Sequence, residues 1–351
     1  MDIKRSWWEL TNCGTTFIEN TVAHLEKNES MVWHCEDKLP WTDHLFKKLR
    51  GANVSSSKSF EIISGAKINN PGEYIFNNYC SPEVQSAYWP SPPEYTHVNF
   101  LAETDNIIIN QRYIFVRDIE SEKTFLQWFN FVDKYLDCVE KSKNSESERA
   151  VFILEYSGKR LNRSSRKIST VKFNLREVDI YTYNLVNTAP EYENYLLNQY
   201  AAELIAQIGN GDVERCGLIS KATDLIYDPQ NAVTRLKNEY PELRRIPDKH
   251  IQDSVQLAQI KILFPIIEQK RREFIGKYYN NILSVLPWRN DYGENRKEPF
   301  EMELRDLLFK ASVIKISFED KKAIEEIKQK RNRLAHNRVL SYEDILYFIG
   351  L

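Results

Sequence analysis

The sequence has little glycine or proline, few cysteines, no long apolar segment and almost no net charge. Among its 351 residues are 11 Gly, 13 Pro and 5 Cys, whereas apolar residues make up 42%. This composition excludes a collagen-like, low-complexity or wholly disordered chain, and the length favours about two domains. A formal charge of −2 argues against a protein that coats nucleic acid by bulk electrostatics, but it is compatible with a local basic surface.

The cysteines are scattered over the first 216 residues without a Cys-x-x-Cys pair. Such a set is typical of free thiols in a reducing compartment and predicts a cytoplasmic protein. Cys13, His34 and Cys35 are the nearest approach to a zinc site, and nothing in their spacing favours one, so we expect neither a metal nor another cofactor. The apolar stretches are too short to cross a bilayer, and the first ten residues, MDIKRSWWEL, lack the apolar core of a signal peptide, so no membrane partner is expected.

Helical and strand patterns alternate through the first 190 residues. Strands separated by helices predict an α/β domain with a mainly parallel sheet. The stretch 69–97 is rich in Pro, Asn, Ser and Tyr and is expected to be a long surface excursion. The predicted strands are 30–33, 59–64, 113–116, 150–154 and 178–186, and the predicted helices are 17–25, 42–49 and 125–139.

From residue 192 onward the pattern is almost wholly helical. A helix over 192–208 is expected to end at Gly209-Asn210-Gly211, and a long helix over 251–286 to be kinked by Pro265. Residues 218–236 are expected to form an irregular helix broken at Pro229. We therefore predict three parts: an α/β domain (1–190), a helical connector (191–245) and an all-α helical bundle (246–351).

The front of the chain lacks the glycine-rich loop that cradles phosphates in a P-loop. Its Gly-Lys pairs are followed by Arg160 and Tyr278 instead of Ser or Thr, and the loop after the first strand is the acidic CEDKLPW. The strand AVFIL ends at Glu155, where a metal-binding or catalytic acid would lie, although Glu155 can equally be an ordinary polar residue leaving a buried strand. This succession of elements resembles a degenerate P-loop or AAA-type domain without a Walker A motif, which implies a fold only, and no ATPase activity is expected.

The most informative stretch is 317–351. Ser317 with Asp320, and Ser341 with Asp344, have the spacing of two capping boxes, each of which begins a helix. Between them lies RNRLAHN, in which Asn332 and His336 are four residues apart and share a helix face, while Arg331 is adjacent around the helix. This set suits a phosphodiester: Arg331 binds the scissile phosphate, His336 moves a proton near neutral pH, and Asn332 orients the substrate.

The positive charge of the chain gathers around the same motif. Residues 251–351 contain 18 Lys and Arg against 15 Asp and Glu, a net charge of +3, whereas the first 250 residues carry −5. The window 328–338 contains no acidic residue. Its other basic side chains are predicted to bind an RNA substrate: Lys328, Lys330, Arg333 and Arg338.

Arg331-Asn332-(x)3-His336, near the end of a helical domain, resembles the Arg-x4-His signature of the HEPN superfamily. The resemblance covers about the last 100 residues, with the helix that begins near 251 as the first bundle element. It implies a helical bundle that pairs as a homodimer, with two copies of the motif facing each other. It further implies a metal-independent endoribonuclease or toxin-like effector of a prokaryotic, anti-phage defence system, which leaves a 2′,3′-cyclic phosphate and is regulated here by the front domain.

Two alternatives remain open at the level of sequence. The motif can be structural, with Arg331 paired to Glu325 or Glu326 and His336 fixing a turn. The protein would then be a non-catalytic assembly or scaffold subunit of a defence or nucleic-acid-processing complex, with protein partners. Outside the motif, Trp7-Trp8 and the aromatic loop 88–95 either stack on bases or on a partner protein, or they pack locally. The basic loop 159–167 either follows a phosphate backbone or is a solvated loop.

Overall fold

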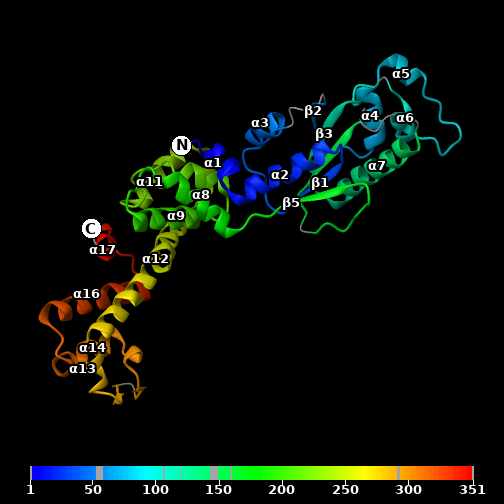
Figure 1. Cartoon of the computed structure of the whole chain (residues 1–351). Coiled ribbons are helices and arrows are strands. Elements are labelled where there is room, and N and C mark those ends of the chain that lie inside the picture. The colour runs from blue at the N-terminus through cyan, green and yellow to red at the C-terminus, as the bar shows by residue number, and fades with distance from the viewer. Residues whose placement is uncertain are drawn as a thin grey trace. The chain divides into compact units, whose positions relative to one another are not determined.

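A five-stranded parallel sheet forms the centre of the first half of the chain (Figure 1). The strand order is β2-β3-β4-β1-β5, so β1 lies between β4 and β5, with Met31 beside Ile153 and Ser169. Every strand pair is parallel, and each crossover between strands therefore runs through helices or long connections. The strands are β1 (Met31–Cys35), β2 (Ser59–Ser64), β3 (Arg112–Ile119), β4 (Val151–Tyr156) and β5 (Ser169–Phe173).

The computed structural model describes residues 2–52, 58–105, 107–119, 121–142, 149–158, 160–290 and 293–349. The chain divides into two compact units, Met1–Asp179 and Ile180–Leu351, called here the first and the second unit. The division falls inside helix α8 (Glu177–Thr188). The segment 191–245, which the sequence suggests as a connector, belongs to the second unit together with 246–351.

One face of the sheet is covered by helices α1 (Ile3–Leu10), α2 (Asn12–Glu26) and α3 (Thr42–Ala52). Aromatic rings fill this layer: Phe17 lies 5.2 Å from Trp33 between ring centres, and Trp33 lies 5.3 Å from Phe115. Trp7 and Trp8 are 0% and 1% exposed, and the indole N–H of Trp8 donates to the carbonyl oxygen of Pro40 at 3.1 Å. The interpretation of this pair as a surface for bases or partners is therefore wrong, because both rings are core.

The opposite face is covered by α4 (Pro71–Tyr79), α6 (His97–Glu103) and α7 (Glu122–Lys141). Part of the stretch expected to be a surface excursion belongs to this layer, since Ile75 and Phe76 of α4 are buried in the core with Trp128 of α7. Asn70 caps α4 and Pro71 occupies its first turn, so the polar and Pro-rich composition marks a helix start as well as loops. A short helix, α5 (Pro82–Ser86), follows.

The predicted strand 178–186 is wrong, because these residues lie in the helix α8. Asp179 lies in the first turn of this helix and stabilises its start: its carboxylate accepts hydrogen bonds from the backbone N–H of Arg176 at 3.3 Å and from the Arg176 guanidinium at 2.9 Å. The last strand of the sheet is instead β5, whose residues Val171 and Phe173 face the core. The other four predicted strands and the three predicted helices of this unit are confirmed within a few residues at their ends.

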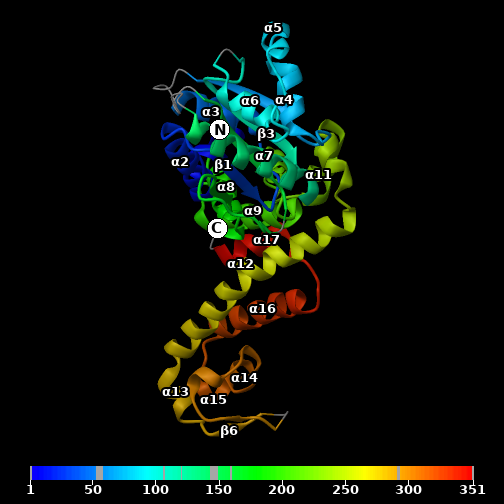
Figure 2. The same ribbon diagram turned by 90° about the vertical axis from the view of Figure 1, so that its right-hand side faces the viewer.

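The second unit is built around one helix of 30 residues, α12 (Asp248–Lys277), which passes through Pro265 (Figure 2). Its first half packs against α9 (Tyr195–Gly209) and α11 (Pro229–Glu239). As predicted, α9 ends at Gly209 with Asn210 in the left-handed conformation at φ +50°. Pro229 does not break a helix, because it occupies the first turn of α11, capped by Asp228, after the separate helix α10 (Val213–Ile219).

The second half of α12 packs against α16 (Phe318–Ala335), and several short elements follow its end. The expected helix 251–286 stops at Lys277, and the unit is not wholly helical, since it contains a two-stranded antiparallel hairpin. The last helix, α17 (Tyr342–Ile349), returns to the first half of α12. The remaining elements are the 3-10 turns η2 (Pro241–Arg245) and η3 (Pro299–Glu301), helices α13 (Tyr279–Leu283), α14 (Leu304–Phe309) and α15 (Ala311–Ile314), and strands β6 (Trp288–Arg289) and β7 (Asn295–Arg296).

Among the described residues, no helix is both long and apolar enough to cross a membrane.

Replacing Trp8 by Ala is expected to lower the free energy of unfolding of the first unit by about 3–5 kcal/mol, because the substitution leaves a cavity in the aromatic layer and removes the bond to Pro40. Urea titration followed by far-UV circular dichroism measures this loss. Trp89→Ala is the matched control, since Trp89 is 77% exposed, and it should change stability by less than about 0.5 kcal/mol. Equal effects of the two substitutions would contradict a buried Trp8.

Candidate functional site

The predicted motif lies in the last turn of α16 and in the residue that follows it. Ser317 caps the start of this helix by accepting from the backbone N–H of Asp320 at 3.1 Å, as predicted. The reciprocal half of this box is not formed, because the Asp320 carboxylate binds Lys277 and Tyr278. The second box is complete: the N–H of Asp344 donates to Ser341 Oγ, and the N–H of Ser341 donates to the Asp344 carboxylate, both at 3.2 Å.

Arg331 and Asn332 line a polar depression of about 520 Å³ at the side of α16. Nη1 of Arg331 lies 3.4 Å from Oδ1 of Asn332, to which it donates. The opposite wall comes from the hairpin and α14 and carries both signs of charge. Its charged residues are Glu294, Arg296, Glu303, Arg305 and Asp306, of which Asp306 is buried and holds Arg296 at 2.9 Å. The depression is thus polar and bordered by a guanidinium and an amide.

His336 forms the C-terminal cap of α16, and its backbone N–H donates to the carbonyl oxygen of Asn332 at 3.0 Å. Its side chain is exposed and makes no hydrogen bond or ion pair with another described residue. Asn337 follows in the left-handed conformation at φ +59° and ends the helix. The imidazole is therefore held at the tip of a rigid helix while both ring nitrogens remain accessible to a ligand.

Two of the basic residues assigned to the substrate are engaged inside the protein. Lys330 and Arg333 both bind the carboxylate of Asp344 at the start of α17, Arg333 at 2.8 Å. Lys330 also lies 3.3 Å from Glu326, and Arg333 donates to the carbonyl oxygen of Val339 at 3.0 Å. These contacts join α17 to α16, so the structure gives both residues a packing role.

Burial raises the pKa of Asp344, but the hydrogen bonds from Lys330 and from the Ser341 N–H, with the charge of Arg333, outweigh it, and the pKa is lowered. The carboxyl is only 15% exposed, which keeps water from screening the pair. The acid-free window 328–338 is therefore neutralised in part by an acid that lies just outside it in sequence.

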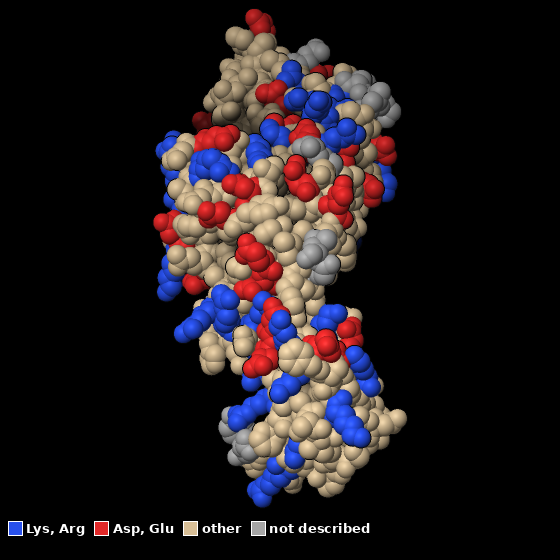
Figure 3. Space-filling view, turned by 90° about the vertical axis from the view of Figure 1, so that its left-hand side faces the viewer, with Lys and Arg blue, Asp and Glu red and all other residues tan. Residues whose placement is uncertain are grey.

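The remaining two basic residues lie in different places. Lys328 lines the depression beside Arg331, whereas Arg338 lies in the connector between α16 and α17 and lines another pocket. In the lower half of the view in Figure 3, Lys and Arg side chains alternate with acidic and uncharged surface. The structure thus brings Lys328, Arg331 and Asn332 together, but it does not gather the whole basic window into one patch.

If the motif were purely structural, Arg331 would be expected to pair with Glu325 or Glu326. The ion pair of Glu326 goes to Lys330 instead, and the guanidinium of Arg331 has Asn332 as its hydrogen-bond partner among the described residues. Arg331 is exposed at the edge of the depression. Its position is therefore that of a residue available to a ligand.

Glu155 lies at the carboxyl end of β4, where its carboxylate binds Nε of Arg117 at 2.6 Å. Arg117 also donates to Oγ1 of Thr42 at 3.3 Å and lies over the ring of Phe46. Glu155 is 9% exposed. In the loop between β1 and α3, the side chain of Leu39 is buried. The carboxylate of Glu155, which lies where a Walker B acid would lie, is therefore paired with the guanidinium of Arg117 from the neighbouring strand β3.

The basic loop that precedes β5 is anchored to α7. Lys167 binds both Asp137 and Glu140, and the hydroxyl of Ser165 donates to Asp133. Lys159 lies outside the described residues, as do residues 143–148 of the polar run before β4. These anchors are intramolecular, which favours a structural role for this end of the loop.

A second pocket, of about 670 Å³, lies in the second unit between α9, the start of α11, α12 and the connector 337–341. Sequence reasoning did not find it, because its residues come from four separate segments of the chain. The one shared signal is the series Gln252, Gln256 and Gln259 at helical spacing on α12, which repeats along one face.

Among the described residues, no group of three or more His, Cys, Asp or Glu side chains is placed to hold a metal ion. Comparison of the chain with protein-family models, with curated proteins and with solved structures gave no match in any of the three.

Replacing Asp344 by Asn is expected to lower the free energy of unfolding of the second unit by about 1–3 kcal/mol at pH 7, because it removes the charge that Lys330 and Arg333 share but keeps a capping oxygen. Because the folded-state pKa is lowered, this contribution is complete above the unfolded value of about 4 and is lost as the pH falls through the folded value. Urea titrations from pH 7 to pH 3 measure it.

Glu343→Gln is the matched control, since Glu343 is the exposed neighbour on the same helix turn. The two variants should differ at pH 7, and the difference between Asp344→Asn and the wild type should shrink as the pH falls below about 4. A constant difference between Asp344→Asn and wild type across this range would contradict the charge pairing.

Proposed function

We propose that the second unit is a metal-independent endoribonuclease of the HEPN type, the effector of a prokaryotic defence system. The observation that carries the proposal is that Arg331 and Asn332 line a polar depression beside the last turn of α16, while the exposed His336 caps the same helix end. The first unit, with its P-loop-like parallel sheet, has the regulatory or docking role. The Arg117–Glu155 pair supports a sheet domain that acts without hydrolysing a nucleotide.

The three motif residues divide the chemistry of RNA cleavage between them. His336 takes the proton of a ribose 2′-OH, whose oxygen attacks the phosphorus, and the bond to the 5′-oxygen breaks. Arg331 binds the non-bridging oxygens and stabilises the charge that develops on them, while Asn332 orients the substrate. The products are a 2′,3′-cyclic phosphate and a 5′-hydroxyl.

The leaving 5′-oxygen requires a proton in the same reaction. One imidazole that has just served as the base is poorly placed to deliver it, so a second copy of the chain supplies a second His336. This is the reason for the proposed homodimer through the C-terminal helices. Lys328 and Arg338 remain as RNA contacts, whereas Lys330 and Arg333 act indirectly by joining α17 to α16.

A non-catalytic assembly subunit is the second candidate, and exposed apolar side chains favour it. Phe309 on α14 is 60% exposed, Val313 on α15 is 57% exposed, and Phe318 at the start of α16 is 79% exposed. Exposed apolar residues of neighbouring elements are typical of surfaces that bind another protein. The same residues also suit the homodimer, so the two candidates are distinguished by activity and not by association.

His336→Ala and Arg331→Ala are each expected to reduce RNA cleavage at least about 100-fold, because they remove the proton acceptor and the phosphate ligand. The assay uses the purified full chain, mixed single-stranded RNA and EDTA, and it reads the product ends for the 2′,3′-cyclic phosphate. Lys322→Ala is the matched control: it removes an exposed cation from α16 outside the motif and should leave the rate unchanged.

Equal cleavage by wild type and His336→Ala in EDTA would end the proposal, because the activity would then come from another site or a contaminant. No cleavage by the wild type, together with a stable complex formed through Phe309 and Phe318, would favour the assembly subunit.

A further inference from the structure

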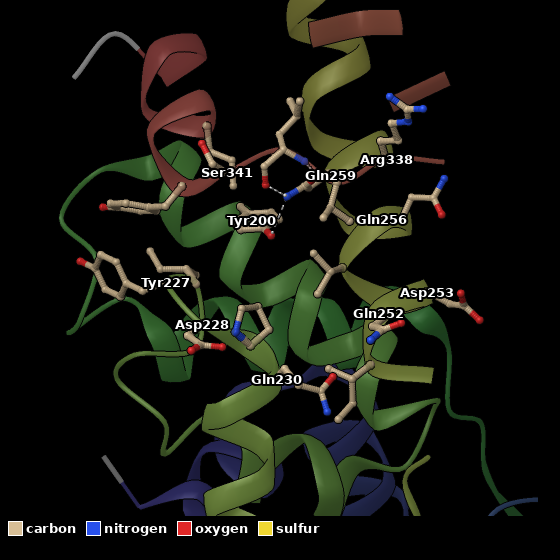
Figure 4. Close-up of a pocket in the computed structure, with 18 of the residues that line it drawn as sticks. Tyr200, Tyr227, Asp228, Gln230, Gln252, Asp253, Gln256, Gln259, Arg338 and Ser341 are labelled. Carbon is tan, nitrogen blue, oxygen red and sulfur yellow. Dashed lines mark hydrogen bonds between the residues drawn. The ribbon is translucent and has the colours of Figure 1, made fainter. Parts of the chain in front are cut away.

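The 670 Å³ pocket of the second unit has the size of small-molecule sites in proteins. In Figure 4, Tyr227 and Asp228 lie on one side of it, Gln252, Gln256 and Arg338 on the other, and Tyr200 between them. Its lining combines apolar surface from Ile251, Val255 and Ile345 with a dense set of polar groups. A ligand that fits this lining has both flat apolar faces and a polar edge.

Carboxamides dominate the polar part of the pocket. A carboxamide offers two N–H donors and an acceptor oxygen in one plane, and this pattern matches the edge of a nucleobase. The oxygen of Gln230 is buried and accepts no hydrogen bond from the described residues. The carboxamide residues are Gln230, Gln252, Gln256, Gln259 and Asn337.

One wall of the pocket is held rigid by α12. The backbone N–H of Leu340 donates to Oε1 of Gln259 at 2.8 Å, and Nε2 of Gln259 donates to the carbonyl oxygen of Leu340 at 3.0 Å. Gln259 is 1% exposed, and Nε2 of Gln256 donates to Oδ1 of Asn337 at 2.6 Å. The connector 337–341 is therefore fixed before any ligand binds, which reduces the entropy lost on binding.

Tyr227 and Tyr342 supply aromatic surface on the other side. Their ring centres lie 4.4 Å apart at an angle of 55° between planes, and Tyr227 is 56% exposed. An exposed ring that is supported by a second ring is suited to stack on a base.

Arg338 is the one basic side chain among the pocket-lining residues, and it makes no hydrogen bond or ion pair with another described residue. A guanidinium without a partner beside a polar pocket is suited to bind a phosphate through two parallel hydrogen bonds. The carboxylate of Asp228, by contrast, is engaged within the protein: it caps α11 by accepting a hydrogen bond from the backbone N–H of Asn231 at 3.2 Å.

We propose that this pocket binds a nucleoside phosphate, with the base beside Gln230, Gln252 and Tyr227, and the phosphate on Arg338. The nucleotide is either free or one unit of an RNA strand, since both present the same base and phosphate. The binding requires neither cleavage nor a second copy of the chain, so it goes beyond the proposed function and can hold or fail without it.

The test is calorimetric titration of the full chain with four nucleoside 5′-monophosphates, the matching nucleosides and ribose 5-phosphate. At least one nucleotide should bind more tightly than ribose 5-phosphate. Tyr227→Ala should weaken nucleotide binding at least about fivefold, because it removes the stacking ring. Arg338→Gln should weaken binding of the nucleotide but leave binding of the nucleoside unchanged. The matched controls are Tyr279→Ala and Lys322→Gln, whose residues lie outside the pocket.

A single-stranded RNA oligomer added in competition, with the His336→Ala variant to prevent its cleavage, identifies the source. Displacement of the mononucleotide by RNA assigns the pocket to a strand, and lack of displacement assigns it to a free nucleotide. Binding that is equal for nucleotides and ribose 5-phosphate, or that is unaffected by Tyr227→Ala, would overturn the proposal, as would no binding of either mononucleotides or RNA. Binding that persists while the wild type cleaves no RNA would remove the proposed function alone.

Discussion

The second unit depends on one buried carboxamide. Gln259 satisfies both backbone groups of Leu340, so a single side chain of α12 does what a neighbouring strand does in a sheet. Loss of either bond would leave a buried polar group without a partner, which costs more than the bond itself contributes. Because Leu340 is held, the chain must turn between the end of α16 and the start of α17 within a few residues. That constraint keeps His336 at a helix tip and Arg338 in the wall of a pocket.

In this unit, tertiary contacts determine which basic side chains are paired and which are exposed, and closeness in sequence does not. Five basic residues within eleven positions read as one RNA-binding surface, yet Lys330 and Arg333 turn to the same carboxylate, while Arg331 and Lys328 line a depression that also contains acids. The depression therefore offers orientation more than bulk attraction. Binding there would rely on directed hydrogen bonds from a guanidinium and an amide, which are less sensitive to salt than a uniformly basic surface.

The elements could be predicted where local pattern and burial agree. The apolar runs of the sheet are fully buried strands, and the Gly-Asn-Gly stop ends α9 as expected. The prediction of a strand over 178–186 was wrong because the alternating β-branched and aromatic residues there are typical of a strand. The carboxylate of Asp179 instead stabilises the first turn of a helix by accepting from the backbone N–H of Arg176. Within the candidate site, spacing shows which residues share a face of α16, but it cannot show that Asp344 binds Arg333. The carboxamide pocket could not be predicted from the sequence for the same reason, since its walls come together only through tertiary packing.

The antiparallel contact of α12 and α16 has a thermodynamic consequence. One wall of the pocket combines the first half of α12 with the connector that follows α16, whose last turns also line the depression of Arg331. Any slide of α16 along α12 therefore changes both cavities at once. A ligand that prefers one register in either cavity would alter the affinity of the other cavity by the same factor in both directions.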